Sequence, residues 1–310
     1  MKTNLNMHVR STFSFPKSYK INWFPGHMVK TYRNLPEQLK KADLFLEIRD
    51  SRIPLTSGND ELNKIIPPHI KRIIIFNKFD LCNQKLTKKI VENYTKQNKN
   101  IKCIFASAKT TQNVQKILDL IIRENNPKFK TVGTWCMIGG IPNVGKSTII
   151  NTFRTMSKDL KELSEQTVKY AQTGKTAATT RNMDCFKINL EPIIFIIDSP
   201  GVMSPEIKSN EQGIKLSVCG NIKDKIAGKE MICDYLLWFM NKNKDFDYVK
   251  ALRLENPSDS IHEVVQVVGT RFKIHNTSNI HDFIFKCFKE GKFGKFTFDD
   301  YVTNDVISQK

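Results

Sequence analysis

Short apolar runs alternate with amphipathic stretches over roughly the first two thirds of the chain. Residues 42–50, 71–80 and 101–109 each contain an apolar run and end in polar side chains. Residues 84–97 and 113–124, between and after these runs, carry apolar side chains at helical spacing. The alternation predicts βαβ units and a parallel sheet. Ligands bind such a sheet beyond the carboxyl ends of its strands, where the polar tails would lie.

Two more apolar runs and a set of helices complete the pattern. Residues 131–140 and 188–201 predict further strands, with Glu191-Pro192 near the start of the second. After about residue 205 the apolar residues recur at helical spacing instead. The helices predicted there cover residues 223–242, 245–254, 259–272 and 279–294.

This pattern divides the chain into three parts. We expect a mostly parallel α/β domain over residues 21–205 and a smaller helical domain over residues 206–310. Residues 1–20 are basic and contain several Ser and Thr, and the first acidic residue is Glu37. This composition is typical of a mitochondrial presequence, but a basic tail without a targeting role would share it.

The charge balance indicates a polyanionic partner. The 310 residues include 49 Lys and Arg against 31 Asp and Glu, which gives a net charge of +18 and a pI near 9.5. Nucleic acid or an anionic membrane surface fits this charge, and a solvated lysine-rich surface is the alternative. The seven cysteines form no C-x-x-C pair that would predict zinc or redox chemistry. No apolar stretch approaches the roughly 18 residues that span a bilayer, so we expect at most a peripheral membrane contact.

The stretch Gly140-x-x-x-x-Gly145-Lys146-Ser147 closes a predicted strand and precedes a helix. Its glycines would let backbone N–H groups surround phosphate, Lys146 would reach the β and γ oxygens, and the Ser147 hydroxyl would ligate Mg²⁺. It therefore predicts a phosphate loop. The candidate nucleotide-binding residues of this loop are Gly140, Asn143, Val144, Gly145, Lys146, Ser147 and Thr148.

Two other strand ends predict recognition of guanine. Asn77-Lys78-x-Asp80 offers a carboxylate that can accept from the N1 and N2 donors of guanine, and adenine has no such donor pair. Ser107-Ala108-Lys109 can offer a backbone N–H to guanine O6. Asn77 and Asp80 therefore disfavour an ATP-using enzyme such as a small kinase.

A fourth motif, Asp198-Ser199-Pro200-Gly201, ends the last predicted strand. The Asp198 carboxylate can hold Mg²⁺ through water, and the Gly201 N–H can approach the γ-phosphate. By itself D-x-x-G is only a turn signal. The four motifs together, each at a strand end, predict a GTP/GDP site with Mg²⁺.

The order of the motifs resembles that of the circularly permuted P-loop GTPases, because the guanine motifs precede the phosphate loop. INWFPGHM at residues 21–28 and Asp50-Ser51-Arg52-Ile53-Pro54 resemble the subfamily that contains bacterial RbgA/YlqF and mitochondrial ribosome-associated GTPase 1. The similarity extends from about residue 21 to 300. It implies a permuted GTPase domain followed by a helical domain that binds RNA or the ribosome.

The resemblance also assigns residues that spacing alone does not. The switch I threonine of the family corresponds to Thr180, which would ligate Mg²⁺, with Thr179 as the second candidate. Ala177-Ala178 stand where the family has Pro-Gly. His27 would position the attacking water, because Val202 follows D-x-x-G where a Ras-type enzyme has Gln.

Three of these assignments have alternatives. Asn143 would help to bind K⁺ in the family interpretation, but it can also be only a loop former. His27 can instead contact RNA or brace the N-terminal segment. Lysines interleaved with phenylalanines near the C-terminus suit RNA, although the phenylalanines can equally be core residues. These residues are Lys286, Lys289, Lys292 and Lys295, with Phe283, Phe285, Phe288, Phe293 and Phe296.

The resemblance implies a slow GTPase that the large ribosomal subunit stimulates and that helps to assemble this subunit on its rRNA. We expect a location in the mitochondrial matrix or at the inner membrane face, with the cytoplasm as the alternative. The competing hypothesis is a GTP-gated RNA-binding module with negligible hydrolysis. Permutation would place Asp198 and Gly201 just before the helical domain, so that nucleotide state could bias that domain.

Overall fold

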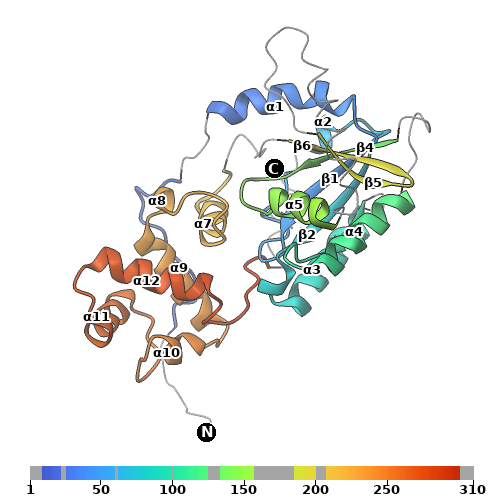
Figure 1. The fold of residues 1–310 in the computed structure, drawn as a ribbon. Coiled ribbons are helices and arrows are strands. Elements are labelled where there is room, and N and C mark those ends of the chain that lie inside the picture. The colour runs from blue at the N-terminus through green and yellow to red at the C-terminus, as the bar shows by residue number, and fades with distance from the viewer. Residues whose placement is uncertain are drawn as a thin grey trace. The chain divides into compact units, whose positions relative to one another are not determined.

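The computed structural model describes residues 9–21, 26–59, 62–98, 101–124, 133–156, 185–199 and 207–300. The chain forms two compact units (Figure 1). The sheet unit comprises Phe24–Pro205 and Thr297–Lys310, and the helical unit comprises Met1–Trp23 and Glu206–Phe296. Each unit therefore combines two segments that are distant in sequence.

The sheet unit contains six described strands in the order β3-β2-β1-β4-β6-β5. All neighbouring strands are parallel except β5, which runs antiparallel to β6 at the edge. The predicted α/β fold with a mostly parallel sheet is confirmed. The strands are β1 (Leu44–Asp50), β2 (Lys71–Asn77), β3 (Lys102–Phe105), β4 (Thr134–Gly139), β5 (Cys185–Leu190) and β6 (Ile193–Asp198).

The prediction of one strand over residues 188–201 is wrong, because the chain reverses within it. β5 ends at Leu190, Glu191-Pro192 forms the turn, and β6 begins at Ile193. The Asn189 side-chain amide donates to the Pro192 carbonyl at 2.8 Å and closes this turn. Proline has no N–H to donate to a ladder, so it marks the end of pairing here.

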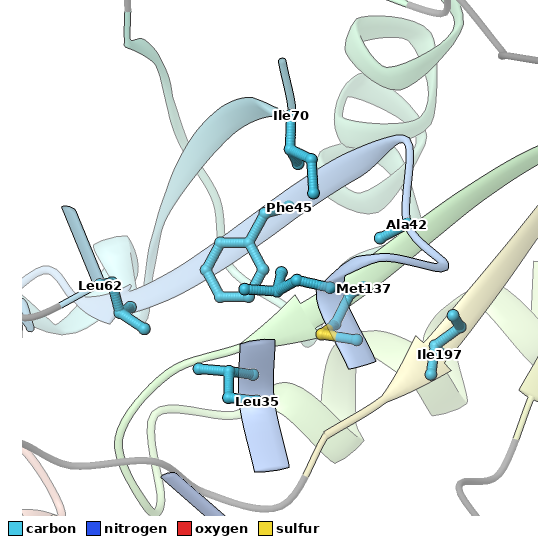
Figure 2. Close-up of a cluster of buried hydrophobic side chains, with 8 residues drawn as sticks. Leu35, Ala42, Phe45, Leu62, Ile70, Met137 and Ile197 are labelled. Carbon is cyan, nitrogen blue, oxygen red and sulfur yellow. The ribbon is translucent and has the colours of Figure 1, made fainter. Parts of the chain in front are cut away.

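Helices cover the sheet and bury its apolar side chains. α1 contributes Leu35 and Leu39 to a cluster with Phe45, Met137 and Ile197 of the sheet (Figure 2). α3 turns Thr87, Ile90 and Val91 inward at helical spacing, while its lysines are exposed. The helices are α1 (Gly26–Leu39), α2 (Leu62–Ile65), α3 (Gln84–Gln97), α4 (Thr111–Glu124) and α5 (Lys146–Met156), with the short 3-10 helix η1 (Phe79–Leu81).

One buried ionic cluster lies on the same face of the sheet as Phe45. The Glu47 carboxylate accepts from Arg49 Nε at 2.9 Å and from Arg72 Nε at 2.9 Å. Burial alone would raise the pKa of Glu47, but the two arginines outweigh this effect and lower it. Removal of one member of such a cluster costs about 3–5 kcal/mol, because it leaves a buried charge uncompensated.

The helical unit is organised around α9, which packs against α7, α8, α11 and α12. The helix predicted over residues 223–242 is interrupted at Gly228, whose φ of +81° is not helical. None of the helices in the described ranges is long and apolar enough to cross a bilayer. The helices are α7 (Asn210–Val218), α8 (Asp224–Ala227), α9 (Lys229–Lys242), α10 (Asp247–Ala251), α11 (Ile261–Phe272) and α12 (Thr277–Lys289).

The phenylalanines near the C-terminus are mostly core residues. Phe285, Phe288, Phe293 and Phe296 are buried, so they cannot stack on bases without unfolding of the unit. The prediction of aromatic stacking is therefore wrong for these four side chains. The interleaved lysines remain on the surface, namely Lys286, Lys289, Lys292 and Lys295.

Residues 9–21 are part of the helical unit. The Arg10 guanidinium donates to Asp234 at 2.8 and 3.0 Å and to Asp259 at 2.9 Å. The Trp238 indole N–H donates to the Arg10 carbonyl at 3.0 Å, and the ring of Phe13 packs against Trp238. Residues from Arg10 onward, which composition placed in a tail or presequence, therefore have specific partners in the fold.

The end of this segment is held equally closely. Asn210 accepts from the Ile21 N–H at 3.1 Å and donates to the Tyr19 carbonyl at 2.7 Å. The Tyr19 hydroxyl donates to the Ala227 carbonyl at 2.6 Å. Ile21 packs directly against Gly213. A Cβ added to Gly213 would lie 2.8 Å from the Ile21 side chain. Removal of residues 1–20 would thus expose part of the helical core.

Residues 297–300 return to the sheet unit, although the sequence predicted a helical domain through residue 310. The Phe298 N–H donates to the Arg52 carbonyl at 2.7 Å. The Asp299 carboxylate accepts from the N–H groups of Leu55 and Thr56 at 2.7 and 2.9 Å. The loop that follows β1 therefore holds the returning chain.

We predict that Arg10→Ala lowers the free energy of unfolding of the helical unit by about 1–2 kcal/mol, because two carboxylates lose a charged hydrogen-bond donor at a half-exposed site. Lys17→Ala is the matched control, because Lys17 is a basic, exposed residue of the same segment. Thermal and urea unfolding would measure these differences, and an Arg10→Ala protein as stable as Lys17→Ala would contradict the prediction.

Candidate functional site

The predicted motifs meet at the carboxyl edge of the sheet. β1 lies between β2 and β4, and the chain order reverses at this point, as expected for a ligand crevice. β2 ends at Asn77, β4 ends at Gly139 just before the phosphate loop, and β6 ends at Asp198. Ser107 follows β3 by two residues. Tertiary structure thus brings segments that are distant in sequence, such as the ends of β2 and β6, to one edge.

The phosphate loop requires glycine at two positions. Gly140 has a φ of +143°, and a Cβ there would lie 2.4 Å from the Ile48 carbonyl oxygen. Gly145 has a φ of +102°, and a Cβ there would lie 2.3 Å from Asn77 Nδ2. Asn143 adopts the left-handed conformation with a φ of 58°. The loop therefore passes very close to β1 and to the end of β2.

Lys146 starts α5 and folds back over its own loop. Its ammonium donates to the carbonyls of Gly140 at 3.1 Å and Ile141 at 3.0 Å. Burial lowers the pKa of Lys146 to about 8, and the charge of Asp198 opposes this shift. A buried cation at a helix N-terminus is suited to bind a phosphate group.

Asn77 connects three loops through one side chain. Its Nδ2 donates to the Val144 carbonyl at 2.8 Å, and its Oδ1 accepts from the Ala108 N–H at 2.9 Å. The Thr152 hydroxyl of α5 donates to the Ala108 carbonyl at 2.8 Å, which adds a second connection. The side chain of Asn77 therefore connects the three loops that carry the predicted motifs, which leaves Asp80 as the candidate to read guanine.

Lys78 makes the neighbouring connection. With a φ of 60°, its backbone is left-handed, and its ammonium donates to the Asn143 carbonyl at 2.7 Å. The same ammonium pairs with Asp50 at 2.9 Å. The Asn77-Lys78-x-Asp80 spacing identified Lys78 from the sequence. Asp50 was noted only as part of the family motif at residues 50–54. The arrangement is visible only when β1 and β2 are placed side by side.

The residues available for Mg²⁺ lie on two neighbouring elements. Ser147 is exposed in the first turn of α5, and Asp198 is paired in register with Ile138 of β4. Hydroxyl and carboxylate oxygens suit Mg²⁺, which takes one or two protein ligands when phosphates supply others. In the part of the chain that the structure describes, no three His, Cys, Asp or Glu side chains gather as a metal site.

Several predicted residues lie outside the described part of the chain. These are Thr179, Thr180, Gly201 and Val202, together with the side chain of His27. The backbone of His27 lies in the first turn of α1. Lys109 is exposed directly after Ala108, and Thr148 is exposed in α5.

Comparisons with known proteins identify similar sequences along most of the chain. A model of the RsgA GTPase family matches residues 61–208. Mitochondrial GTPase 1 of Aedes aegypti is 31% identical over 316 residues, which cover 94% of this chain and 97% of that protein. Mitochondrial ribosome-associated GTPase 1 of Ictalurus punctatus is 31% identical over 96% of this chain and 98% of its own length.

A bacterial relative and a solved structure show the same likeness. Ribosome biogenesis GTPase A of Bacillus cereus is 29% identical over 90% of this chain and 93% of that protein. The crystal structure of GNP-bound YlqF from T. maritima aligns with a TM-score of 0.56 and 22% identity, covering 87% of this chain and 97% of that one. At this identity the structural likeness concerns the fold alone.

We predict that Gly145→Ala weakens GDP binding at least tenfold, because the new Cβ would displace Asn77 from the loops that it connects. Gly228→Ala is the matched control. Gly228 also has a positive φ, but its Cβ would meet no atom within 4 Å. Both variants pay a similar backbone penalty of about 1 kcal/mol, and only Gly145→Ala should change the affinity. Titration with a fluorescent GDP analogue would measure this, and equal affinities would contradict the prediction.

We predict that GDP affinity falls about tenfold between pH 7 and pH 9, because the cationic form of a group with a pKa of about 8 is lost over this interval. The pKa of Lys146 is lowered, so the ammonium that attracts phosphate is present below pH 8 and disappears above it. Lys146→Arg remains charged throughout and should lose this part of the pH dependence. The same slope in both proteins would show that Lys146 is not responsible.

Proposed function

We propose that this chain binds and hydrolyses GTP during assembly of the large ribosomal subunit. The chain belongs to the circularly permuted GTPase family that includes mitochondrial ribosome-associated GTPase 1 and ribosome biogenesis GTPase A. The observation that carries this proposal is the connection between Asn77, Lys78 and the phosphate loop. A base-reading motif bonded to a phosphate loop suits a guanine nucleotide and has no evident use otherwise.

Each part of the nucleotide has a candidate partner. Asp80 accepts from the guanine N1 and N2 donors. Ser107, Ala108 and Lys109 complete the base-binding loop. Lys146 and the N–H groups of the phosphate loop bind the β and γ phosphates. Adenine lacks the donor pair that Asp80 requires, so GTP is the preferred substrate.

Hydrolysis of GTP requires that the attacking water is positioned and that the negative charge on the transferring phosphoryl group is balanced. Lys146 holds a positive charge against the phosphate oxygens, and the N-terminus of α5 adds its dipole. Ser147, Thr180 and Asp198 would hold Mg²⁺, which supplies further positive charge when it is bound. The Gly201 N–H binds the γ-phosphate in switch II.

The attacking water needs a partner that Val202 cannot provide. His27 takes this role from the first turn of α1, and Asn143 contributes to a K⁺ site beside the phosphates. Lys78 already fixes the carbonyl of Asn143, which supports a defined orientation of this residue in the loop. Intrinsic turnover is slow because His27 reaches its place only with the partner bound.

The large ribosomal subunit and its rRNA are the proposed partner. The helical unit presents Lys286, Lys289, Lys292 and Lys295 on its surface, where they contact RNA phosphates rather than bases. The similarity to mitochondrial proteins favours the matrix, including the inner membrane face, over the cytoplasm. Any presequence that is removed ends before Arg10, because Arg10 is held in the fold.

The decisive test is the GTP hydrolysis rate in potassium buffer, with and without large ribosomal subunits from the same compartment. We expect at least tenfold stimulation by the subunits, and less in sodium buffer. Asp80→Asn is the matched control for base reading, since it should lose stimulation with GTP and regain it with XTP. Tight GTP binding without stimulated turnover would overturn the enzymatic role and favour the GTP-gated RNA-binding module, for which Val202 is the supporting observation.

A further inference from the structure

We infer that Asp50 is a positioning residue for nucleotide binding, which acts through Lys78 to hold the phosphate loop. This inference rests on the proposed guanine nucleotide site. Asp50 is the last residue of β1 and is fully buried. It belongs neither to the phosphate loop nor to a base-reading motif, and it would touch no part of the nucleotide. Its effect on binding is therefore transmitted through another side chain.

The carboxylate of Asp50 accepts hydrogen bonds from two cations. Oδ1 accepts from the Arg52 backbone N–H and from Arg52 Nε, both at 3.0 Å. Oδ2 accepts from Arg52 Nη2 at 2.7 Å and pairs with Lys78 Nζ at 2.9 Å. Burial would raise the pKa of Asp50, but Arg52 and Lys78 outweigh burial and lower it to about 2. The carboxylate is thus charged at every physiological pH.

Lys78 transmits this arrangement to the phosphate loop. The ammonium has Asp50 on one side and the Asn143 carbonyl on the other, at 2.9 and 2.7 Å. A lysine side chain rotates freely unless charged partners hold it, and ordering it costs up to about 2 kcal/mol of entropy. Asp50 offsets this cost before the nucleotide arrives. The Asn143 carbonyl is then held next to the Val144 carbonyl, which accepts a hydrogen bond from Asn77 Nδ2.

The charge of the group also favours an anionic ligand. Lys78, held by Asp50, places its ammonium against the Asn143 carbonyl of the phosphate loop. This charge contributes to the attraction of phosphate without direct contact. The loop after β1 has further partners, because the Arg52 carbonyl accepts from the Phe298 N–H and the Thr56 N–H donates to Asp299. These bonds hold the loop that carries Arg52, the other partner of Asp50.

A buried carboxylate can instead serve stability alone, and the chain offers a matched comparison. Glu47 lies on the same strand, is equally buried and is also held by two cations. It points to the other face of the sheet, because three positions separate it from Asp50 on an alternating strand. It contacts Arg49 and Arg72 rather than Lys78. Glu47→Gln therefore reports the cost of a lost buried charge without a route to the phosphate loop.

The test is a double-mutant cycle on GDP affinity, measured at 20 °C with a fluorescent GDP analogue. We expect Asp50→Asn to weaken binding about tenfold, as expected for loss of one charge-assisted hydrogen bond. In the Lys78→Met background the same change should cost less than twofold, because the side chain that it positions is gone. Glu47→Gln should lower the melting temperature but leave the affinity within twofold.

A second variant keeps the inference testable if Asp50→Asn fails to fold. Asp50→Leu with Arg52→Met replaces the buried pair as a unit, which proteins tolerate better than removal of one partner. It leaves Lys78 without this carboxylate and should also weaken GDP binding about tenfold. A full loss from Asp50→Asn in the Lys78→Met background would overturn the inference, as would an equal loss from Glu47→Gln. GDP binding by the unaltered protein is the starting condition, and its absence would refute the proposed function itself.

Discussion

The loops at the carboxyl edge of the sheet are joined through two successive carbonyl groups of the phosphate loop. Val144 and Asn143 are held by the side chains of Asn77 and Lys78, which are also successive. These bonds connect the end of β2 with the loop after β4, across the intervening strand β1. Because both bonds are made by one motif, a displacement of the base-reading loop must move the phosphate loop as well. This coupling is independent of the order of the motifs along the chain.

Charged side chains accompany this connection. Arg52 and Asp50 are buried at the end of β1, Lys78 is partly buried beside them, and Asp50 carries the negative charge that pairs with both cations. A cation that is removed from water is stabilised only if a partner replaces its hydration. Lys146 uses the carbonyls of its own loop for this purpose, and its lowered pKa records that the replacement is incomplete. A phosphate group would complete it, which is why the site favours an anion.

Each of the two units includes a segment from near one end of this sequence. The N-terminal residues 9–21 pack on the helical unit through Arg10, and residues 297–300 pack on the sheet unit through Asp299. The chain therefore passes between the units near residues 23, 205 and 296. Permutation places the proposed switch II just before the second of these passages. The loop that holds the third passage also contains Arg52, the partner of Asp50.

The sequence by itself determined the parallel sheet, the phosphate loop and the guanine motifs, because apolar periodicity and glycine requirements are local properties. It left undecided whether the phenylalanines near residue 290 face RNA or the core, since lysines and phenylalanines at helical spacing suit both. Tertiary structure decided this question by burying Phe288 and Phe296. It also revealed the turn at Pro192, the place of Arg10 and the contacts of Asp50 with Arg52 and Lys78. Each of these depends on a partner more than 25 residues away or on the reversal of a strand, and no local pattern records which distant residue will be the partner.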